Sequence, residues 1–131
     1  MDKVYVIGGN SKYGGSKESC VGFSTKTHEW TKLKRMIEAT DCAACSLFEG
    51  RIVVSGGFPL GTVPETKTVT EYDHVTDAWR RMPNMNSGKA IHQQVACGSK
   101  RFVFGWKEGN EVFDRFSNRF QVIKPHPECL C

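Results

Sequence analysis

The stretch Arg51-Ile52-Val53-Val54-Ser55-Gly56-Gly57 decides the fold of this 131-residue chain. Its β-branched residues favour a buried strand, and its two final glycines leave room for another piece of backbone or a large ring to come close. Tyr72 and Trp79 follow, on either side of a turn-rich stretch at residues 73–78. If this hairpin is symmetric, the two rings form a cross-strand pair. We therefore expect three successive strands of a small antiparallel sheet with one aromatic pair.

The same unit occurs on both sides of this stretch. Each copy has a hydrophobic strand that ends in glycine, followed by two aromatic residues seven positions apart. The copies are Lys3-Val4-Tyr5-Val6-Ile7-Gly8-Gly9 with Phe23 and Trp30, and Arg101-Phe102-Val103-Phe104-Gly105-Trp106 with Phe113 and Phe120. The strands begin 48 and 50 residues apart. Such a period, made of short strands, is typical of β-propeller blades, whereas an all-β sandwich would need the glycines to coincide by chance.

These residues resemble kelch repeats, which carry a double glycine after one strand and Tyr and Trp on the next two. The segments CAACSLFEGRIVVSGG (residues 42–57) and EYDHVTDAWRRMPNM (residues 71–85) resemble in particular the kelch domains of BTB-kelch, or kelch-like, proteins. The resemblance extends from Lys3 to about Ile123. It implies an all-β, partial kelch β-propeller with about two and three-quarter four-stranded antiparallel blades.

The predicted kelch-repeat domain covers residues 1–124, and residues 125–131 form a tail. Its blades are expected at about residues 1–35, 36–83 and 84–124, and the first lacks its innermost strand. The eleven expected strands lie near residues 3–9, 19–25, 29–33, 41–48, 51–57, 68–73, 78–82, 90–97, 101–106, 110–115 and 119–123. Two prolines make the tail a poor closing strand.

The resemblance also implies a BTB domain and a helical segment upstream. We therefore expect a truncated gene model or a fragment of a longer adaptor; the alternative is a genuine short protein that assembles with copies of itself. In either case two apolar blade faces are left uncovered, so self-association is expected when the chain is expressed alone.

The sequence shows no clear set of catalytic or metal-binding residues. Cys42 and Cys45 form a C-x-x-C pair, but they fall in a predicted strand, where residues three apart point to opposite faces. We expect buried thiols, no disulfides, no metal and no cofactor. No Ser-His-Asp or paired-carboxylate arrangement stands out, so the chain is not predicted to be an enzyme. Copper enzymes that resemble galactose oxidase use this fold, and they remain a remote alternative.

Charge and hydropathy place further limits on function. The formal net charge is +4, but the basic residues are scattered among acidic ones, so nucleic-acid binding is not expected. A signal peptide and an apolar run long enough for a membrane span are both missing from the sequence. We expect a cytoplasmic protein.

Recognition of a protein partner is the function that the sequence favours. In kelch-like proteins the loops between the second and third strands, and those between blades, share the binding face; here the loops at residues 10–18 and 58–67 are long. The expected partner-binding residues are Tyr13, Arg35, Phe58, Lys89, His92 and Lys107. Basic residues outnumber acidic ones in these loops, which favours an acidic peptide.

The resemblance implies a substrate-recognition module of a cullin-3 ubiquitin-ligase adaptor, which would reach cullin-3 only through a BTB domain. A cytoskeletal, actin-binding or scaffolding kelch protein is the alternative. Two departures from the family pattern matter here. Ala39-Thr40-Asp41 stands where kelch-like blades often have arginine, and the third blade has Gly105-Trp106, Phe113 and Phe120 in place of the double glycine, Tyr and Trp. A known peptide specificity therefore cannot be transferred.

Overall fold

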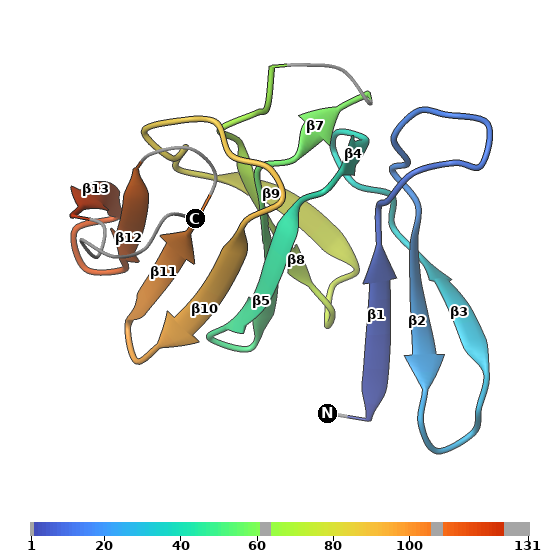
Figure 1. The fold of residues 1–131 in the computed structure, drawn as a ribbon. Coiled ribbons are helices and arrows are strands. Elements are labelled where there is room, and N and C mark those ends of the chain that lie inside the picture. The colour runs from blue at the N-terminus through green and yellow to red at the C-terminus, as the bar shows by residue number, and fades with distance from the viewer. Residues whose placement is uncertain (1, 61–63, 106–108, 125–131) are drawn as a thin grey trace.

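The computed structural model describes residues 2–60, 64–105 and 109–124, and all its regular elements are strands (Figure 1). The strands are β1 (Lys3–Ile7), β2 (Cys20–Ser24), β3 (Trp30–Leu33), β4 (Thr40–Asp41), β5 (Ala44–Phe48), β6 (Arg51–Ser55), β7 (Phe58–Pro59), β8 (Val69–Asp73), β9 (Ala78–Met82), β10 (Gln93–Cys97), β11 (Lys100–Phe104), β12 (Asn110–Asp114) and β13 (Arg119–Ile123). The eleven predicted blade strands are confirmed, while β4 and β7 were not predicted.

Three antiparallel sheets form successive blades of a partial β-propeller. Blade 1 is β1-β2-β3, blade 2 is β5-β6-β8-β9 and blade 3 is β10-β11-β12-β13. The second and third blades have four strands, as predicted, and within the described residues no strand pairs with the free edge of β1. The short strands β4 and β7 pair with each other inside two of the long loops.

The three predicted aromatic pairs are confirmed as directly opposed residues on neighbouring strands. The ring centroids lie 4.9 Å apart for Phe23 and Trp30, 5.1 Å apart for Tyr72 and Trp79, and 5.2 Å apart for Phe113 and Phe120. In blades 2 and 3 the pair lies on the blade face that points toward the preceding blade. In blade 2 this face buries Tyr72 against Tyr5 of blade 1, with ring centroids 6.2 Å apart.

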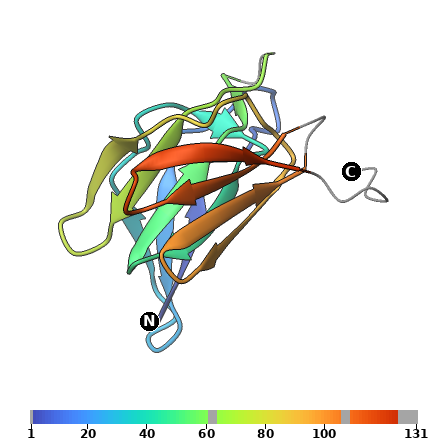
Figure 2. The same ribbon diagram turned by 90° about the vertical axis from the view of Figure 1, so that its left-hand side faces the viewer.

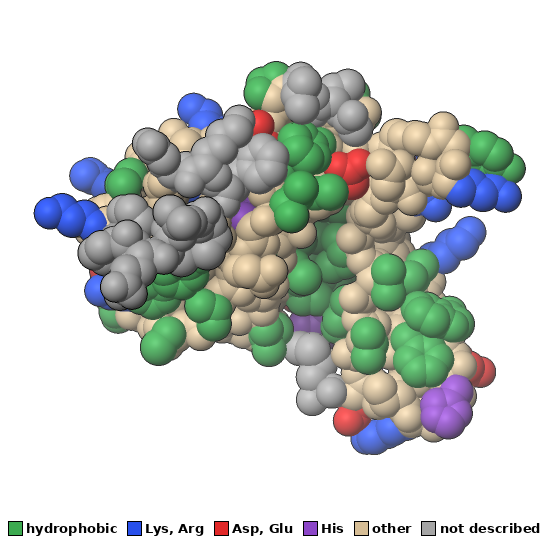
Figure 3. Space-filling model, in the orientation of Figure 1, with side chains coloured by type: hydrophobic (Ala, Val, Ile, Leu, Met, Phe, Trp, Pro, Cys, Tyr) green, Lys and Arg blue, Asp and Glu red, His purple; other side chains and the backbone are tan. Residues whose placement is uncertain are grey.

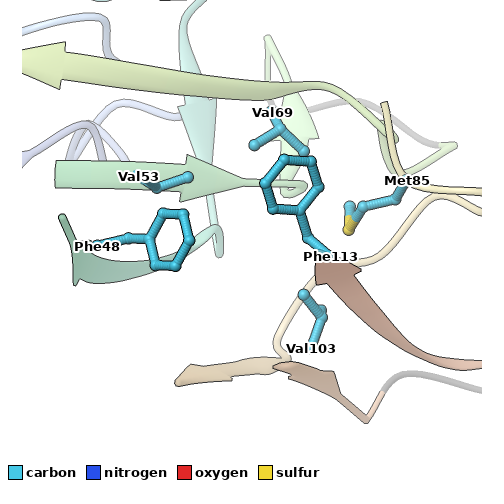
Figure 4. Packing of buried hydrophobic residues seen from close by; sticks show 6 residues of the cluster. All are labelled: Phe48, Val53, Val69, Met85, Val103 and Phe113. Atoms are coloured by element: carbon cyan, nitrogen blue, oxygen red, sulfur yellow. The ribbon is translucent and has the colours of Figure 1, made fainter. Parts of the chain in front are cut away.

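The core consists of two apolar layers, each sandwiched between neighbouring blades. The layer between blades 1 and 2 contains Cys20, Met36, Ile52, Val54 and Tyr72. The layer between blades 2 and 3 contains Phe48, Val53, Val69, Met85, Val103 and Phe113, whose side chains converge from both sheets (Figure 4). Because each β strand alternates its side chains between two faces, every internal blade contributes to both layers.

The predicted close approach at the glycines is made by backbone. Gly57 N donates a hydrogen bond of 2.7 Å to Lys89 O, and Gly9 N donates one of 3.1 Å to Thr40 O. Lys89 and Thr40 lie in the connections that lead out of blades 2 and 1. In blades 1 and 2, the chain therefore crosses the glycine-containing end of the strand on its way to the next blade.

The antiparallel order separates long connections from tight turns. The loops between the second and third strands and those between blades lie at one end of the sheets, whereas the hairpin turns lie at the other end (Figures 1 and 2). We call these ends the long-loop face and the turn face.

Trp79 should contribute more to stability than Trp30, although each is paired with another ring. Trp79 is half-buried against blade 1 and its Nε1 donates a 2.9 Å hydrogen bond to Lys34 O, whereas Trp30 is 62% exposed. Trp79→Ala should lower the free energy of unfolding by about 3 kcal/mol, and Trp30→Ala by about 1 kcal/mol or less. Denaturant titration of both variants measures the difference, and equal losses would contradict this account of blade stacking.

Candidate protein-interaction face

The long-loop face consists of residues 8–19, 34–43, 56–60, 64–68 and 83–92. Hydrogen bonds join neighbouring loops to one another across it. Asn10 Nδ2 donates to Asp41 Oδ2 (2.9 Å), Ser16 Oγ donates to Phe58 O (2.9 Å), and Leu60 N donates to Ala39 O (3.3 Å). These contacts connect residues that are far apart in sequence, so the loops form one continuous and fixed surface.

The loop between β1 and β2 presents an exposed aromatic side chain at its tip. Ser11 N donates to Gly15 O (3.0 Å) and Gly14 N donates to Ser11 O (2.9 Å), which closes a tight turn around residues 12 and 13. Tyr13 is 86% exposed, and Lys12 Nζ lies 4.8 Å from its ring centroid. Basic and hydrophobic side chains are visible together at this tip in Figure 3. The predicted contact residue Tyr13 is therefore accessible to a partner.

Arg35 and Phe58 lie on the same face but differ in accessibility. Arg35 is exposed and its Nη1 lies 2.8 Å from Glu18 Oε1, so its guanidinium is held at the surface by an ion pair. Phe58 is half-buried, because β7 pairs it with Asp41 of β4. Lys107 lies outside the described residues.

The structure does not place Lys89 on the surface. Its side chain is 0% exposed, and its Nζ lies 3.0 Å from Glu111 Oε2 and 2.8 Å from Ser87 Oγ. Glu111 also accepts a hydrogen bond from Asn86 N (2.6 Å). Burial raises the pKa of Glu111, but the bonds from Asn86 and Lys89 outweigh it and hold that pKa below its ordinary value. The expected contact residue Lys89 instead joins the entry into blade 3 to strand β12.

His92 is also buried rather than presented to a partner. Its Nε2 lies 3.0 Å from Ser55 Oγ, and Ser55 Oγ donates to Gln94 Oε1 at 2.7 Å. Because that hydroxyl proton is directed to Gln94, the Ser55 oxygen accepts a hydrogen bond from His92 Nε2–H. His92 Nδ1 is buried with no hydrogen-bond partner among the described residues. His92 thus links blade 3 to the end of β6 in blade 2.

Sequence reasoning missed three exposed apolar residues on this face. Leu60 is 71% exposed, Ile91 is 69% exposed and Ile37 is 43% exposed. Leu60 and Ile91 have positive φ angles of 53° and 50°, an uncommon conformation for such side chains. Their loop positions gave no periodic signal that could have separated them from core residues.

The basic excess of the face is partly neutralised. Arg35 pairs with Glu18, and Arg81 Nη2 lies 3.0 Å from Glu38 Oε1. Lys89 is buried with Glu111, as described above. Lys12, Lys17, Lys34 and Lys67 remain as exposed basic residues. The surface is therefore less positive than the count of charged residues in the sequence suggests.

The prediction of buried thiols was wrong for three of the cysteines. Cys20 is buried, but Cys42, Cys45 and Cys97 are exposed and free. Cys45 lies on the face of β5 that points toward blade 1, where no inner strand of that blade covers it within the described residues. In the same described part of the chain, no group of three or more His, Cys, Asp and Glu side chains is arranged to hold a metal ion.

None of the described residues forms a helix that is long and apolar enough to cross a membrane.

Comparison with known proteins gives similarities to kelch-repeat sequences. The family described as "Kelch motif" matches residues 39–86. Kelch-like protein 36 of Rattus norvegicus is 25% identical over 101 residues, which cover 73% of this chain and 16% of that protein. An F-box/kelch-repeat protein of Arabidopsis thaliana is 26% identical over 122 residues, which cover 92% of this chain and 32% of that protein. Beta-scruin of Limulus polyphemus is 30% identical over 88 residues, which cover 63% of this chain and 10% of that protein.

Among solved structures, that of YjhT superposes with a TM-score of 0.81 at 17% sequence identity. The match covers 97% of this chain and 49% of that structure. At this identity the match bears on the fold alone. The chain spans at most about a third of the curated relatives named above.

The buried histidine predicts a pH dependence of stability. Burial, assisted by the charge of Lys89, lowers the pKa of His92 from 6.5 to about 4. The unfolded chain therefore takes up a proton near pH 6.5 that the folded chain does not accept until about pH 4. The stabilisation is fully present above pH 6.5 and is lost as the pH falls toward 4.

Denaturant titrations between pH 4 and 7 measure this effect. His92→Gln should flatten the fall in the free energy of unfolding, although it lowers stability at neutral pH. His74→Gln, on an exposed hairpin turn, is the matched control and should keep the slope of the unmodified chain. An unchanged slope in His92→Gln would show that other groups cause the pH dependence.

Proposed function

We propose that this chain, which is a kelch-repeat protein folded as part of a β-propeller, serves as a protein-interaction module and not as an enzyme. The long-loop face carries the binding site. The observation that supports this most strongly is the combination of a hydrogen-bonded set of loops with an accessible Tyr13 and exposed apolar residues. Rigid scaffolds that present loops are common recognition surfaces, and tyrosine and arginine are enriched at binding hot spots.

The partner is proposed to be a protein segment with acidic residues. Tyr13 and Leu60 offer apolar contact area, while Lys12 and Lys17 offer positive charge and Arg35 offers a guanidinium that Glu18 already pairs. An acidic segment with a hydrophobic anchor complements this combination. Since Lys89 and His92 are buried, their role is to hold the loops in place and not to contact the segment.

A ubiquitin-ligase role is the finer form of this proposal. The resemblance to kelch-like proteins supports a substrate-recognition module of a cullin-3 adaptor in the cytoplasm, with contact to cullin-3 made by a BTB domain and not by this chain. Binding to filamentous actin in a co-sedimentation assay would instead favour the cytoskeletal alternative.

Charge reversal on the two faces tests the location of the site. Arg35→Glu should slow the association of an acidic peptide and weaken its salt dependence, because charges near a binding site steer encounter. Arg119→Glu, on the exposed side of β13, is the matched control and should have little effect. Tyr13→Ala should weaken binding by about 1 kcal/mol or more.

The measurement is fluorescence anisotropy with a set of acidic peptides at two salt concentrations. Circular dichroism of each variant shows whether the fold is intact. A loss of binding with Arg119→Glu alone, or equal losses with both reversals, would place the site elsewhere.

Self-association is proposed for the chain on its own. Blade 1 exposes an apolar face that contains Val4, Val6, Phe23 and Trp30, and hydrophobic side chains gather over this sheet in Figure 3. By strand register, this face corresponds to the face of blade 2 that is buried against blade 1. A second copy of the chain offers a complementary blade face that could cover it.

Sedimentation velocity over a range of concentrations measures the association. We expect concentration-dependent oligomers, and Val4→Lys should shift the distribution toward monomer because it places a charge in the contact. Val75→Lys, which changes a still more exposed valine on a hairpin turn (81% exposed, against 51% for Val4), should leave the distribution unchanged. A concentration-independent monomer would contradict the proposal.

A further inference from the structure

A cavity of about 220 Å³ lies between blades 2 and 3, near the turn face. Its wall includes the rings of Phe48 and Phe113, and three arginines, Arg51, Arg80 and Arg115, lie around it. It is separate from the long-loop face and belongs to none of the contacts proposed for a protein partner. An apolar wall surrounded by guanidinium groups is suited to an anionic group that must be partly removed from water.

The charges around the cavity are arranged as ion pairs. Arg80 contacts Glu71, whose side chain is 5% exposed, and Arg51 Nε lies 3.6 Å from the same carboxylate. Arg51 Nη2 also lies 3.3 Å from Asp73 Oδ2. Each of these carboxylates is therefore already balanced by a cation.

The ion pair between Arg115 and Glu49 joins blade 3 to blade 2 at the same cavity. The Arg115 side chain is 56% exposed, so its guanidinium is accessible from solvent.

Arg101 supplies an additional positive charge, whose N–H groups have no hydrogen-bond partner among the described residues. Its side chain is 0% exposed, and its Nε, Nη1 and Nη2 atoms have no hydrogen-bond acceptor among the described residues. The guanidinium carbon lies 5.1 Å from the ring centroid of Phe113, 5.4 Å from that of Phe120 and 5.8 Å from that of Phe48. Aromatic faces attract a cation but accept none of its hydrogen bonds in the way an oxygen does.

The position of Arg101 relates it directly to the cavity. Two of the rings around its guanidinium, Phe48 and Phe113, also line the cavity, so the group lies directly behind the cavity wall. Four arginines in this interface thus face three carboxylates, Glu49, Glu71 and Asp73. The arginines therefore outnumber the carboxylates by one, and the buried Arg101 is the one that no carboxylate contacts through a hydrogen bond.

We propose that this cavity binds a phosphate group, with Arg101 and Arg115 as its principal ligands. A tetrahedral oxyanion has acceptors on all sides, so it can receive N–H groups from the inner wall and from the mouth at once. Binding requires the Arg101 side chain to adopt a rotamer that directs its N–H groups past the two rings. The phosphate then provides the acceptors that the buried guanidinium lacks and balances its charge.

The direct test uses inorganic phosphate and the 131-residue chain. Thermal unfolding is followed at increasing phosphate concentration, with sodium chloride added to keep the ionic strength constant. We expect a saturable rise in the unfolding temperature. Arg101→Met replaces the guanidinium with an unbranched apolar side chain. It should abolish the rise or weaken the apparent affinity for phosphate by about tenfold or more. Arg119→Gln, an exposed arginine outside the cavity, is the matched control and should behave as the unmodified chain.

Two further measurements keep the test decisive. If Arg101→Met does not fold, Arg115→Gln at the cavity mouth should show the same loss of phosphate binding in isothermal titration calorimetry. O-phosphoserine and inorganic phosphate are compared to learn whether a phosphorylated side chain or a free phosphate is preferred, and acetate at equal ionic strength should bind more weakly than either.

The proposal is overturned if phosphate has no effect beyond that of chloride, or if acetate stabilises the chain as much as phosphate does. Equal stabilisation of the unmodified chain, Arg101→Met and Arg115→Gln would mean an adventitious ion only.

Discussion

The rest of the structure depends on the crossing of backbone over the glycine-containing ends of β1 in blade 1 and β6 in blade 2. In blade 2 a Cβ atom added to Gly56 would lie 2.1 Å from Lys89 O, and in blade 1 one added to Gly8 would lie 2.8 Å from Thr40 O. Both glycines have positive φ angles, 65° and 66°. Any other residue would therefore meet both a steric overlap and a strained backbone, so the crossing requires glycine.

This crossing determines how neighbouring blades stack. Through that stacking it also determines where the long-loop face and the turn face lie. The connection that passes the glycines of one blade begins the next, so the next sheet must stack against the first. The stack buries the aromatic pair of the next blade, and the polar groups of that pair find partners at the boundary. The Tyr72 hydroxyl donates a 2.7 Å hydrogen bond to Asp77 Oδ1. The same oxygen accepts a 2.8 Å hydrogen bond from Lys34 N, in the connection out of blade 1.

The sequence predicted the repeated parts of the fold well because repetition supplies independent copies of one pattern. Eleven strands and three aromatic pairs follow from hydrophobic alternation and from one fixed spacing. The roles of Lys89 and His92 could not be predicted in the same way. Both lie in a connection without periodicity, and their burial depends on Glu111 and Ser55, which are distant in sequence. The accessible Tyr13 was identified from its place in a long loop and from its aromatic side chain, while Leu60 and Ile91 gave no signal.

The third blade keeps the geometry of the repeat but changes its chemistry. Strand register places Phe113 opposite Arg101 where blade 2 places Tyr72 opposite Ile52. Phe113 and Phe120 lack the hydroxyl and the indole N–H that fasten Tyr72 and Trp79, and Asn118 stands where blade 2 has Asp77.

Blade 3 has instead the charged side chain of Arg101 among the phenylalanine rings, and a buried ion pair of Lys89 with Glu111 lies in the same interface. Such buried charges stabilise a protein only when each has its partner. The Lys89 ammonium has three acceptors, whereas the Arg101 guanidinium has none among the described residues. The two cations therefore differ in kind: the first is a completed structural contact, and the second is a buried group whose hydrogen bonds depend on what enters the space beside it.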